Sequence, residues 1–255
     1  MDSKDALEPS IQMGRAERLG NLFFRYRSWM PFVLAILLPA AIVHFHYPLG
    51  DPKLDLPWEL ICLTVSLMGF GIRVMTAGFA PKGTSGRNTS GQKAQGLNTT
   101  GMYSLVRNPL YLGNSLVWLG VVMFPRVWWV LAVVMAMFAF FHIFIIHAES
   151  QFLRRKFGRE YADWAGKTPV FIPRLRGWKQ PELPFCFRTV CRREHASFFA
   201  LIVSFVVIEI LGDIVIQRRP EFDLFWAITF SISLVIYVLL RTLKKSTTHL
   251  KVSGR

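Results

Sequence analysis

The chain has 255 residues, of which 52% are hydrophobic and 18% are charged, and its mean hydropathy of +0.34 lies above the range usual for soluble proteins. This composition excludes an ordinary soluble domain and predicts an all-α, polytopic membrane protein. The formal net charge of +14 would also suit nucleic-acid binding, but the positions of the basic residues favour a membrane surface instead.

Six apolar runs have about the length that a helix needs to cross the hydrocarbon layer. They lie at about 30–46, 58–79, 110–124, 127–147, 196–216 and 223–240. The first run follows 29 polar or mixed residues and ends in HFHYPLG, which has no small-residue cleavage site, so we expect a retained anchor and not a signal peptide. About six transmembrane helices are therefore predicted.

The 30 lysines and arginines are distributed unevenly about these spans. Only four of them fall in the short loops after the first, third and fifth spans: Lys53, Arg126, Arg218 and Arg219. By the positive-inside rule, this asymmetry predicts that the N- and C-termini are both cytoplasmic. The basic segment 154–193 would then face anionic lipid, and nucleic acid is not expected as a partner.

The loop between the second and third spans, residues 81–101, is rich in Gly, Ser, Thr and Asn. Loops of this length are either functional lids or disordered, and the sequence favours neither. We expect residues 1–180 to form a core with four spans, and residues 181–255 to add a C-terminal helix pair.

The third span begins with residues that suit a helix N-terminus. Asn108 is a favoured N-cap residue, and Pro109 is pre-organised for the first helical position. The apolar run from Leu110 to Phe124 has only 15 residues, so its N-terminus should lie below the headgroups, where free N–H groups suit a bound anion. Gly113 and Gly120 would let another helix approach closely.

Only Pro125 and Arg126 separate the third span from the fourth, which predicts a tight antiparallel hairpin. The two outer ends of this hairpin return to the cytoplasmic face. We therefore expect a group of residues to meet there: Arg107, Asn108, Tyr111, His147 and Glu149. An acid at the end of an apolar span is a functional candidate by default.

The segment SQFLRRKFGREYADW (150–164) follows the hairpin and is typical of a cytoplasmic amphipathic helix broken at Gly158. Its apolar residues Phe152, Leu153, Phe157 and Tyr161 are expected to lie on the membrane interface.

Two segments resemble signatures of the isoprenylcysteine carboxyl methyltransferase and phospholipid methyltransferase superfamily. TTGMYSLVRNPLYLGN resembles G-x-Y-x-x-x-R-H-P-x-Y-x-G, and AESQFLRRKFGREYADWAGKTPVFIP resembles E-E-x-x-L-x-x-x-F-G-x-x-Y-x-x-Y-x-x-x-x-P-x-x-x-P. The motifs occupy residues 101–113 and 148–174. The resemblance implies an integral membrane enzyme that transfers a methyl group from S-adenosylmethionine to a lipid or lipidated acceptor at the cytoplasmic face.

Carried onto this sequence, the resemblance implies that Arg107 and Glu149 are the catalytic residues. With the hairpin geometry, it implies a wider cofactor-binding set: Tyr103, Arg107, Asn108, Pro109, Tyr111, Gly113, His147, Glu149 and Tyr161. Asn108 replaces the motif's histidine and Ser150 its second glutamate. Because neither replacement is a base near neutral pH, a carboxylate or phosphate oxygen is slightly favoured over an amine as the acceptor.

The physical roles expected within this site follow from the charges of S-adenosylmethionine. Arg107 and the N-terminus of the third span would receive an anionic group, while Glu149 and the carbonyl end of the fourth span would receive a cationic one. Tyr111 and Tyr161 would pack on the adenine or face the sulfonium.

Other interpretations of the same residues remain open. Membrane sterol and steroid reductases, which use NADPH, resemble the first motif too, and a non-catalytic protein could keep the fold. Arg107 would also serve as a positive-inside anchor, and Glu149 could pair with Arg154 or Arg155.

Three further groups of residues have side chains that can bind metals or charged ligands. No metal site is predicted, because the histidine pairs His44/His46 and His142/His147 lack a third ligand. The three cysteines do not indicate a disulfide or zinc framework. Glu209 and Asp213 lie one turn apart in the fifth span and either bind an acceptor headgroup or, through Asp213, reach Arg218. The sequence does not indicate an oligomeric state.

Overall fold

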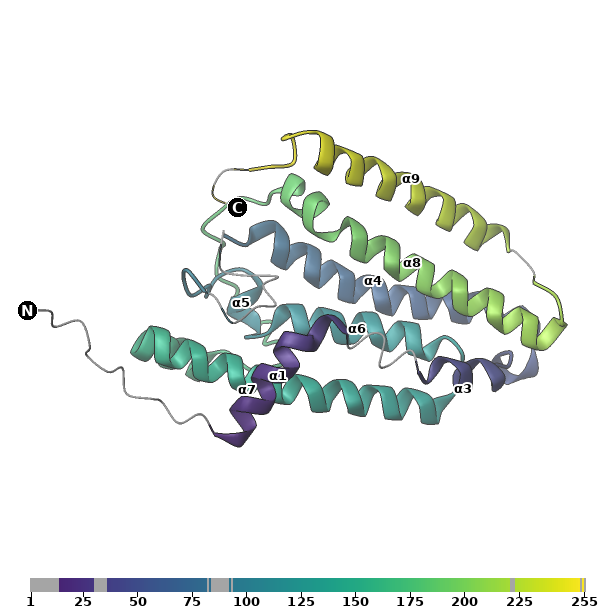
Figure 1. The fold of residues 1–255 in the computed structure, drawn as a ribbon, viewed down its shortest axis with the longest axis horizontal. Coiled ribbons are helices and arrows are strands. Elements are labelled where there is room, and N and C mark those ends of the chain that lie inside the picture. The colour runs from purple at the N-terminus through teal and green to yellow at the C-terminus, as the bar shows by residue number, and fades with distance from the viewer. Residues whose placement is uncertain are drawn as a thin grey trace, which may run out of the picture.

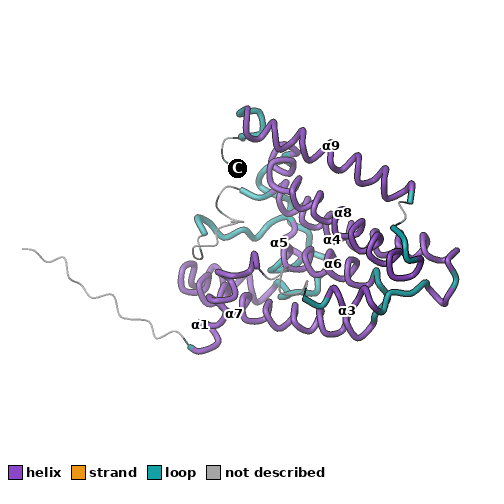
Figure 2. Tube along the Cα trace, turned by 45° about the vertical axis from the view of Figure 1, so that its right-hand side comes forward, coloured by secondary structure: helices purple, strands orange, loops and turns teal. Residues whose placement is uncertain are grey.

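The computed structural model describes residues 14–29, 36–81, 83, 92, 94–220, 223–252 and 254. Within these ranges all regular structure is helical, which confirms the predicted all-α class (Figure 2). The helices are α1 (Arg15–Tyr26), α3 (Leu38–Val43), α4 (Asp55–Phe79), α5 (Met102–Leu105), α6 (Pro109–Met123), α7 (Trp128–Lys167), α8 (Phe187–Gln217) and α9 (Leu224–Ser246). Short 3-10 turns lie at Arg27–Trp29, Pro48–Gly50 and Pro52–Leu54.

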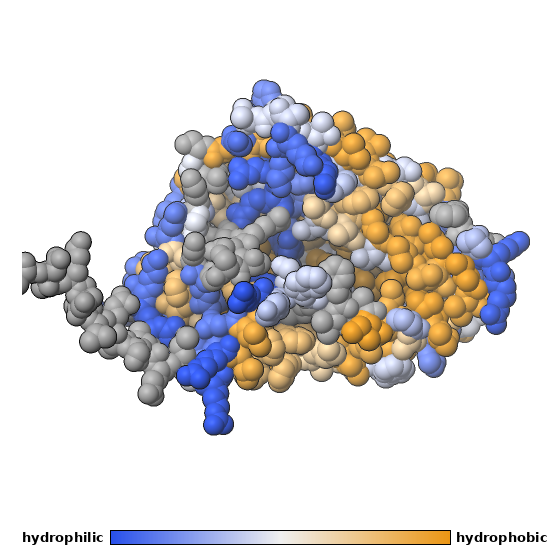
Figure 3. Space-filling model, viewed as in Figure 1, coloured by the Kyte–Doolittle hydropathy of each residue, from blue (hydrophilic) through white to orange (hydrophobic). Residues whose placement is uncertain are grey.

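Four helices of the described ranges are long and apolar enough to cross a membrane: Pro52–Phe79, α7, α8 and α9. Helix α6 is apolar but has only 15 residues. The expected first span, 30–46, lies partly outside the described residues, and in its described part, 36–46, only the six residues of α3 are helical. The structure therefore supports an integral membrane protein with four long candidate spans, and the predicted count of six is not confirmed. Apolar surface covers much of the helix flanks and meets hydrophilic surface toward both ends (Figure 3).

The long helices lie side by side in the order α9, α8, α4, α6, α7 (Figure 1). Helix α4 packs between α6 and α8, and α1 packs across α7. Three aromatic residues join α8 and α9 to this bundle: Phe205 of α8 stacks on Trp226 of α9 at 5.5 Å, and Phe124 lies 5.2 Å from Phe205. The division of the chain into a core and an appended pair stays a prediction.

Small residues allow α4 and α6 to approach each other closely. A Cβ atom on Gly120 would lie 2.2 Å from Ser66 Oγ and 2.3 Å from the Cys62 carbonyl oxygen, and one on Gly113 would lie 2.8 Å from the Gly69 oxygen. The packing role predicted for Gly113 and Gly120 is therefore confirmed. Gly113 faces α4, and its motif-based part in cofactor binding stays a prediction.

Alanine at Gly69 is expected to lower the free energy of unfolding by about 1–3 kcal/mol, because overpacking forces backbones apart. Its Cβ would lie 2.5 Å from the Gly113 oxygen and 2.7 Å from the Val117 nitrogen, both backbone atoms. Gly71, two residues along, has open space beside it, so Gly71→Ala should be neutral or stabilising by up to about 1 kcal/mol. Unfolding of both variants in detergent micelles tests this, and equal stability would contradict the close packing.

A buried charge pair holds α4 to α8 near the end that carries α5. Arg73 donates to Glu194 from Nε at 3.1 Å and from Nη2 at 2.6 Å, and also to Ser197 Oγ at 3.3 Å. A further hydrogen bond links Arg73 to Asn114 of α6. Because charges inside a membrane are costly unless paired, this network favours one arrangement of the three helices.

Candidate functional site

The two motif segments are hydrogen-bonded to each other. The residues that follow α7 lie along α5 and the start of α6, where the Arg107 N–H donates to the Pro169 oxygen at 2.8 Å and the Arg174 N–H donates to the Leu105 oxygen at 2.9 Å. Three more bonds extend the contact: Trp164 Nε1 to the Tyr103 oxygen, the Gly101 N–H to the Lys179 oxygen, and the Lys179 N–H to Ser104 Oγ. Segments about 60 residues apart in sequence therefore form one unit.

The start of α6 is where the sequence predicts it, but its cap differs. Pro109 is the first helical residue and Asn108 occupies the N-cap position, as expected. The side chain of Asn108, however, does not cap the helix, because its amide Nδ2 donates to the Val170 oxygen at 3.0 Å. The amide thus joins the second motif to the first and leaves the helix N–H groups without a side-chain cap.

Tyr111 and Glu149 meet as predicted. The Tyr111 hydroxyl donates to Glu149 Oε1 at 3.0 Å, which joins the first turn of α6 to the middle of α7. Arg27, in the turn after α1, contributes a third group, with Nη1 3.5 Å from the Tyr111 hydroxyl and 3.9 Å from Glu149 Oε1. The side chains of Arg27 and Glu149 are 21% and 26% exposed, so both remain within reach of a ligand.

Arg27 was missed in the sequence, where it is one of several basic residues in the N-terminal tail. Its position depends on how α1 packs on α7: a Cβ on Gly20 would lie 2.1 Å from the Phe144 oxygen, so the two helices are in close contact. A second ion pair joins these helices, between Glu17 and Arg155. Arg155 therefore pairs with α1, and not with Glu149 as one alternative proposed.

The side chain of Arg107 has an unsatisfied donor. Its Nε is buried and has no hydrogen-bond partner among the residues that the structure describes. A buried donor left unpaired costs about 1–3 kcal/mol, and this one lies beside the start of α6, whose free N–H groups also favour an anion. Arg107 is thus poised to donate to an anionic group.

Two tyrosines lie beside these residues. Tyr103 in α5 is partly buried, and its removal from water, together with the nearby Glu149 carboxylate, raises its pKa, so the hydroxyl remains protonated at neutral pH. Tyr161 is 2% exposed and packs edge-on against Trp164 at 5.7 Å. The expectation that Tyr161 lies on the membrane interface is wrong, because its side chain is buried inside the protein beside Trp164.

Two further expectations about α7 need correction. The helix does not end near His147 but continues through Glu149 to a break at Gly158, where φ is 51° and ψ is −118°. The carbonyl groups near Glu149 therefore lie within a continuing helix, where its own N–H groups bind them. His147 is exposed and does not join Glu149, because two residues along a helix place side chains on nearly opposite faces.

Of the two acids in the fifth span, Glu209 faces the interior of the protein. It is 3% exposed and lies close to Glu59 and Asp55 of α4. Asp213 accepts a hydrogen bond from Gln217 at 3.4 Å. Neither residue lies near the motif residues in sequence or along the bundle, since α8 carries them at the end opposite α5 (Figure 1).

Comparison with known proteins supports the family resemblance of the two motif segments. The family model described as phospholipid methyltransferase matches residues 60–160. The cobalt-zinc-cadmium resistance protein CzcN of Cupriavidus metallidurans is 32% identical over 176 residues, which cover 67% of this chain and 74% of that protein. The nickel-cobalt-cadmium resistance protein NccN of Alcaligenes xylosoxydans xylosoxydans is 30% identical over 118 residues, 46% of this chain and 55% of that protein. No solved structure matches the chain.

The match to the family model begins within α4 and ends at residue 160, beyond Gly158. It therefore includes the whole first motif segment and about half of the second. The chain therefore belongs to the phospholipid methyltransferase family, within the superfamily of isoprenylcysteine carboxyl methyltransferase-like membrane proteins.

Proposed function

We propose that this protein transfers a methyl group from S-adenosylmethionine to an oxygen of a lipid or lipidated acceptor, at the cytoplasmic face of a membrane. The observation that carries the proposal is the hydrogen-bonded pairing of the two motif segments, which places Arg107 and Asn108 of the first motif against residues 169 and 170 of the second. Tyr111 and Glu149, from the same motifs, are bonded to each other beside this pairing.

The charges of these residues fit the cofactor. S-Adenosylmethionine carries a carboxylate, an ammonium and a sulfonium group. Arg107 has a buried Nε in need of an acceptor, which suits the carboxylate, and the uncapped N-terminus of α6 adds a favourable potential. Glu149 would balance the cationic groups, and it would do so by its side chain alone, because α7 continues past it.

S-Adenosylmethionine, when bound, supplies a methyl group on a positively charged sulfur. The protein's own residues would then act chiefly by positioning and by excluding water, which provide much of the rate in displacement reactions. Tyr111 holds the Glu149 carboxylate by a hydrogen bond, and Arg27 approaches the same oxygen from α1. Tyr161 packs against Trp164 of the second motif, and Trp164 donates to the Tyr103 oxygen of the first.

The residues of the site fit a carboxylate or phosphate acceptor better than an amine. An amine must lose a proton before or during methylation, whereas a carboxylate or phosphate oxygen needs no base. The position of the motif's histidine is held by Asn108, whose amide is bonded to Val170 and has no basic nitrogen. The second glutamate of the motif is Ser150.

The site would lie on the cytoplasmic side, with both termini on that side, as the distribution of basic residues predicts. Helices α6 and α7, joined through residues 124–127, would enter from this side and return to it as a hairpin. The two resistance proteins are similar to this chain over the family region, and their printed names indicate metal resistance without specifying a reaction.

Equilibrium binding of S-adenosylmethionine to the purified protein in mild detergent tests the proposal, with NADPH as competitor. We expect saturable binding of one S-adenosylmethionine per chain that NADPH does not displace. Binding of NADPH alone would instead support the reductase alternative. Binding of neither would contradict methyl transfer and leave a non-catalytic role.

A further inference from the structure

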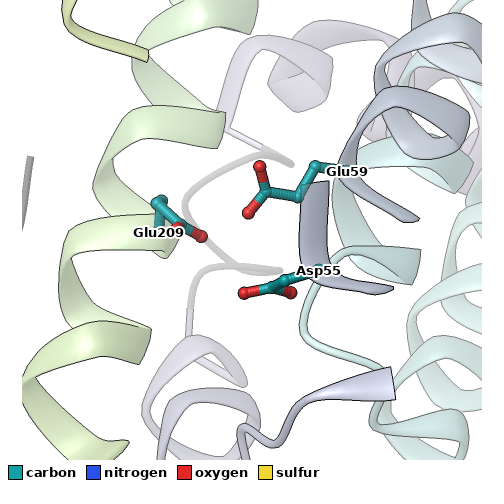
Figure 4. Close-up of side chains that lie close together, drawn as sticks. All are labelled: Asp55, Glu59 and Glu209. Carbon is teal, nitrogen blue, oxygen red and sulfur yellow. The ribbon is translucent and has the colours of Figure 1, made fainter. Parts of the chain in front are cut away.

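A second cluster of ionisable residues lies at the end of the bundle opposite the motif site. Asp55 and Glu59 come from the first two turns of α4, and Glu209 comes from α8. One carboxylate oxygen from each lies within 4.8 Å of the others. The three side chains point toward a common space between the two helices (Figure 4).

Two of these carboxylates are almost completely buried and are only partly satisfied. Glu59 is 1% exposed and Glu209 is 3% exposed. Trp226 Nε1 donates to Glu59 Oε2 at 2.8 Å. The other oxygen of Glu59, Oε1, and Oε2 of Glu209 are buried, and no N–H or hydroxyl donor in the described part of the chain reaches them. The two carboxyl groups are close enough to share one proton with each other. Each helix therefore contributes a buried acceptor to the cluster.

The charges of the cluster do not balance. Arg126 is the cation that pairs with it, through a contact of 2.5 Å between Nη1 and Asp55 Oδ1, and its guanidinium also lies 4.5 Å from the centre of the Phe45 ring. Counted over the described residues of the cluster, three carboxylates and the Arg126 guanidinium leave two negative charges in excess. Buried charges are costly unless they are paired or bind a metal ion. A divalent cation neutralises both charges, whereas a single shared proton leaves one.

The donor set also indicates what kind of cation fits. All three ligands are carboxylate oxygens, which hard cations such as Mg²⁺, Ca²⁺ and Mn²⁺ prefer. In such sites each metal–oxygen distance is about 2.0–2.6 Å, so oxygens on opposite sides of the ion lie about 4–5 Å apart. The separation of at most 4.8 Å here agrees with one shared ion.

We propose that Asp55, Glu59 and Glu209 bind one hard divalent cation, which links α4 to α8 on the side of the membrane opposite the motif site. Trp226 holds Glu59 from α9 and thereby joins the third helix to the ion. The role is structural, because a cation that neutralises the cluster stabilises the packed helices. The inference depends on this cluster alone and does not rest on methyl transfer.

Mn²⁺ binding to the full-length protein tests this inference. After treatment with a chelator and its removal, the protein in detergent is titrated with Mn²⁺, and the signal of free Mn²⁺ is followed by electron paramagnetic resonance. We expect one bound Mn²⁺ per chain and competition by Mg²⁺ or Ca²⁺. Glu59→Gln and Glu209→Gln should each bind Mn²⁺ at least about tenfold more weakly. Loss of a residue that only supports a metal ligand already lowers metal affinity about 10- to 100-fold, and loss of the ligand itself should lower it at least as much.

A matched surface variant separates this site from non-specific adsorption. Asp163→Asn removes a carboxylate whose side chain is 68% exposed, and it should leave the Mn²⁺ affinity unchanged. The glutamine variants keep the side-chain shape and remove only charge, and their elution as a single detergent-solubilised species verifies their folding. Absence of saturable Mn²⁺ binding to the wild type, or equal affinity in Glu209→Gln and wild type, would overturn the proposal.

Discussion

Glutamine at position 149 is expected to weaken S-adenosylmethionine binding at least about 30-fold, because it removes the negative charge that faces the cationic groups of the cofactor. Loss of one partner of a desolvated, hydrogen-bonded charge pair typically costs about 2–5 kcal/mol, and 2 kcal/mol corresponds to about 30-fold in affinity. The amide oxygen of glutamine still accepts the Tyr111 hydroxyl bond, so folding should be retained. Isothermal titration calorimetry in detergent measures the change.

A second variant on the same helix controls for a general change in surface charge. Glu160 lies beyond the break at Gly158 and is exposed, so Glu160→Gln should bind the cofactor as the wild type does. If Glu149→Gln also kept the wild-type affinity, Glu149 would be removed from the proposed site. Loss of affinity in both variants would instead indicate a general electrostatic effect of the cytoplasmic face.

Alanine at Arg107 is the second variant with a large expected effect. A hydrogen bond to a charged group contributes about 1.5–3 kcal/mol, so S-adenosylmethionine affinity should fall by about 10- to 150-fold. Stability should not fall, because the backbone N–H of residue 107 donates to the Pro169 oxygen in the variant as well. The alanine variant also removes the buried, unpartnered Nε, which costs stability when no ligand is bound.

Arg174→Ala is the matched control for this experiment. Arg174 also donates from its backbone to the opposite motif segment, but its side chain is exposed. Its replacement should therefore leave cofactor affinity within about twofold, as is usual for exposed charges. An Arg107→Ala protein that binds as tightly as Arg174→Ala would remove the Arg107 side chain from the proposed site.

Several elements could be predicted because local chemistry decides them. Length and hydropathy identified α4, α7, α8 and α9 as helices that could span a membrane. Pro109 marked the first residue of α6, and Gly158 marked the break in α7. The small side chains of Gly113 and Gly120 predicted a close helix contact without naming α4 as the partner.

Predictions failed where a side chain or helix contacts residues that are distant in sequence. Asn108 has the residue type of a helix cap, yet its amide bonds to Val170, 62 residues away. The fourth span was expected to end with its apolar residues, but α7 continues to Lys167. Its polar second half contacts α1 through the Glu17–Arg155 ion pair and α5 through the bond from Trp164 to the Tyr103 oxygen. Ten residues of the long loop 81–101, 82, 84–91 and 93, lie outside the described residues, so neither interpretation of the loop is decided.

The amino-acid sequence was enough to establish a helical membrane protein, to locate two methyltransferase-like motifs and to bring Tyr111 near Glu149, since each depends on hydropathy, short-range spacing or the length of one connection. Tertiary packing alone decided that Arg27 joins that pair, that Arg73 meets Glu194, and that Asp55, Glu59 and Glu209 share one buried space. Those contacts join helices far apart in the chain. Their geometry follows from which helix faces pack together, and no local pattern encodes it.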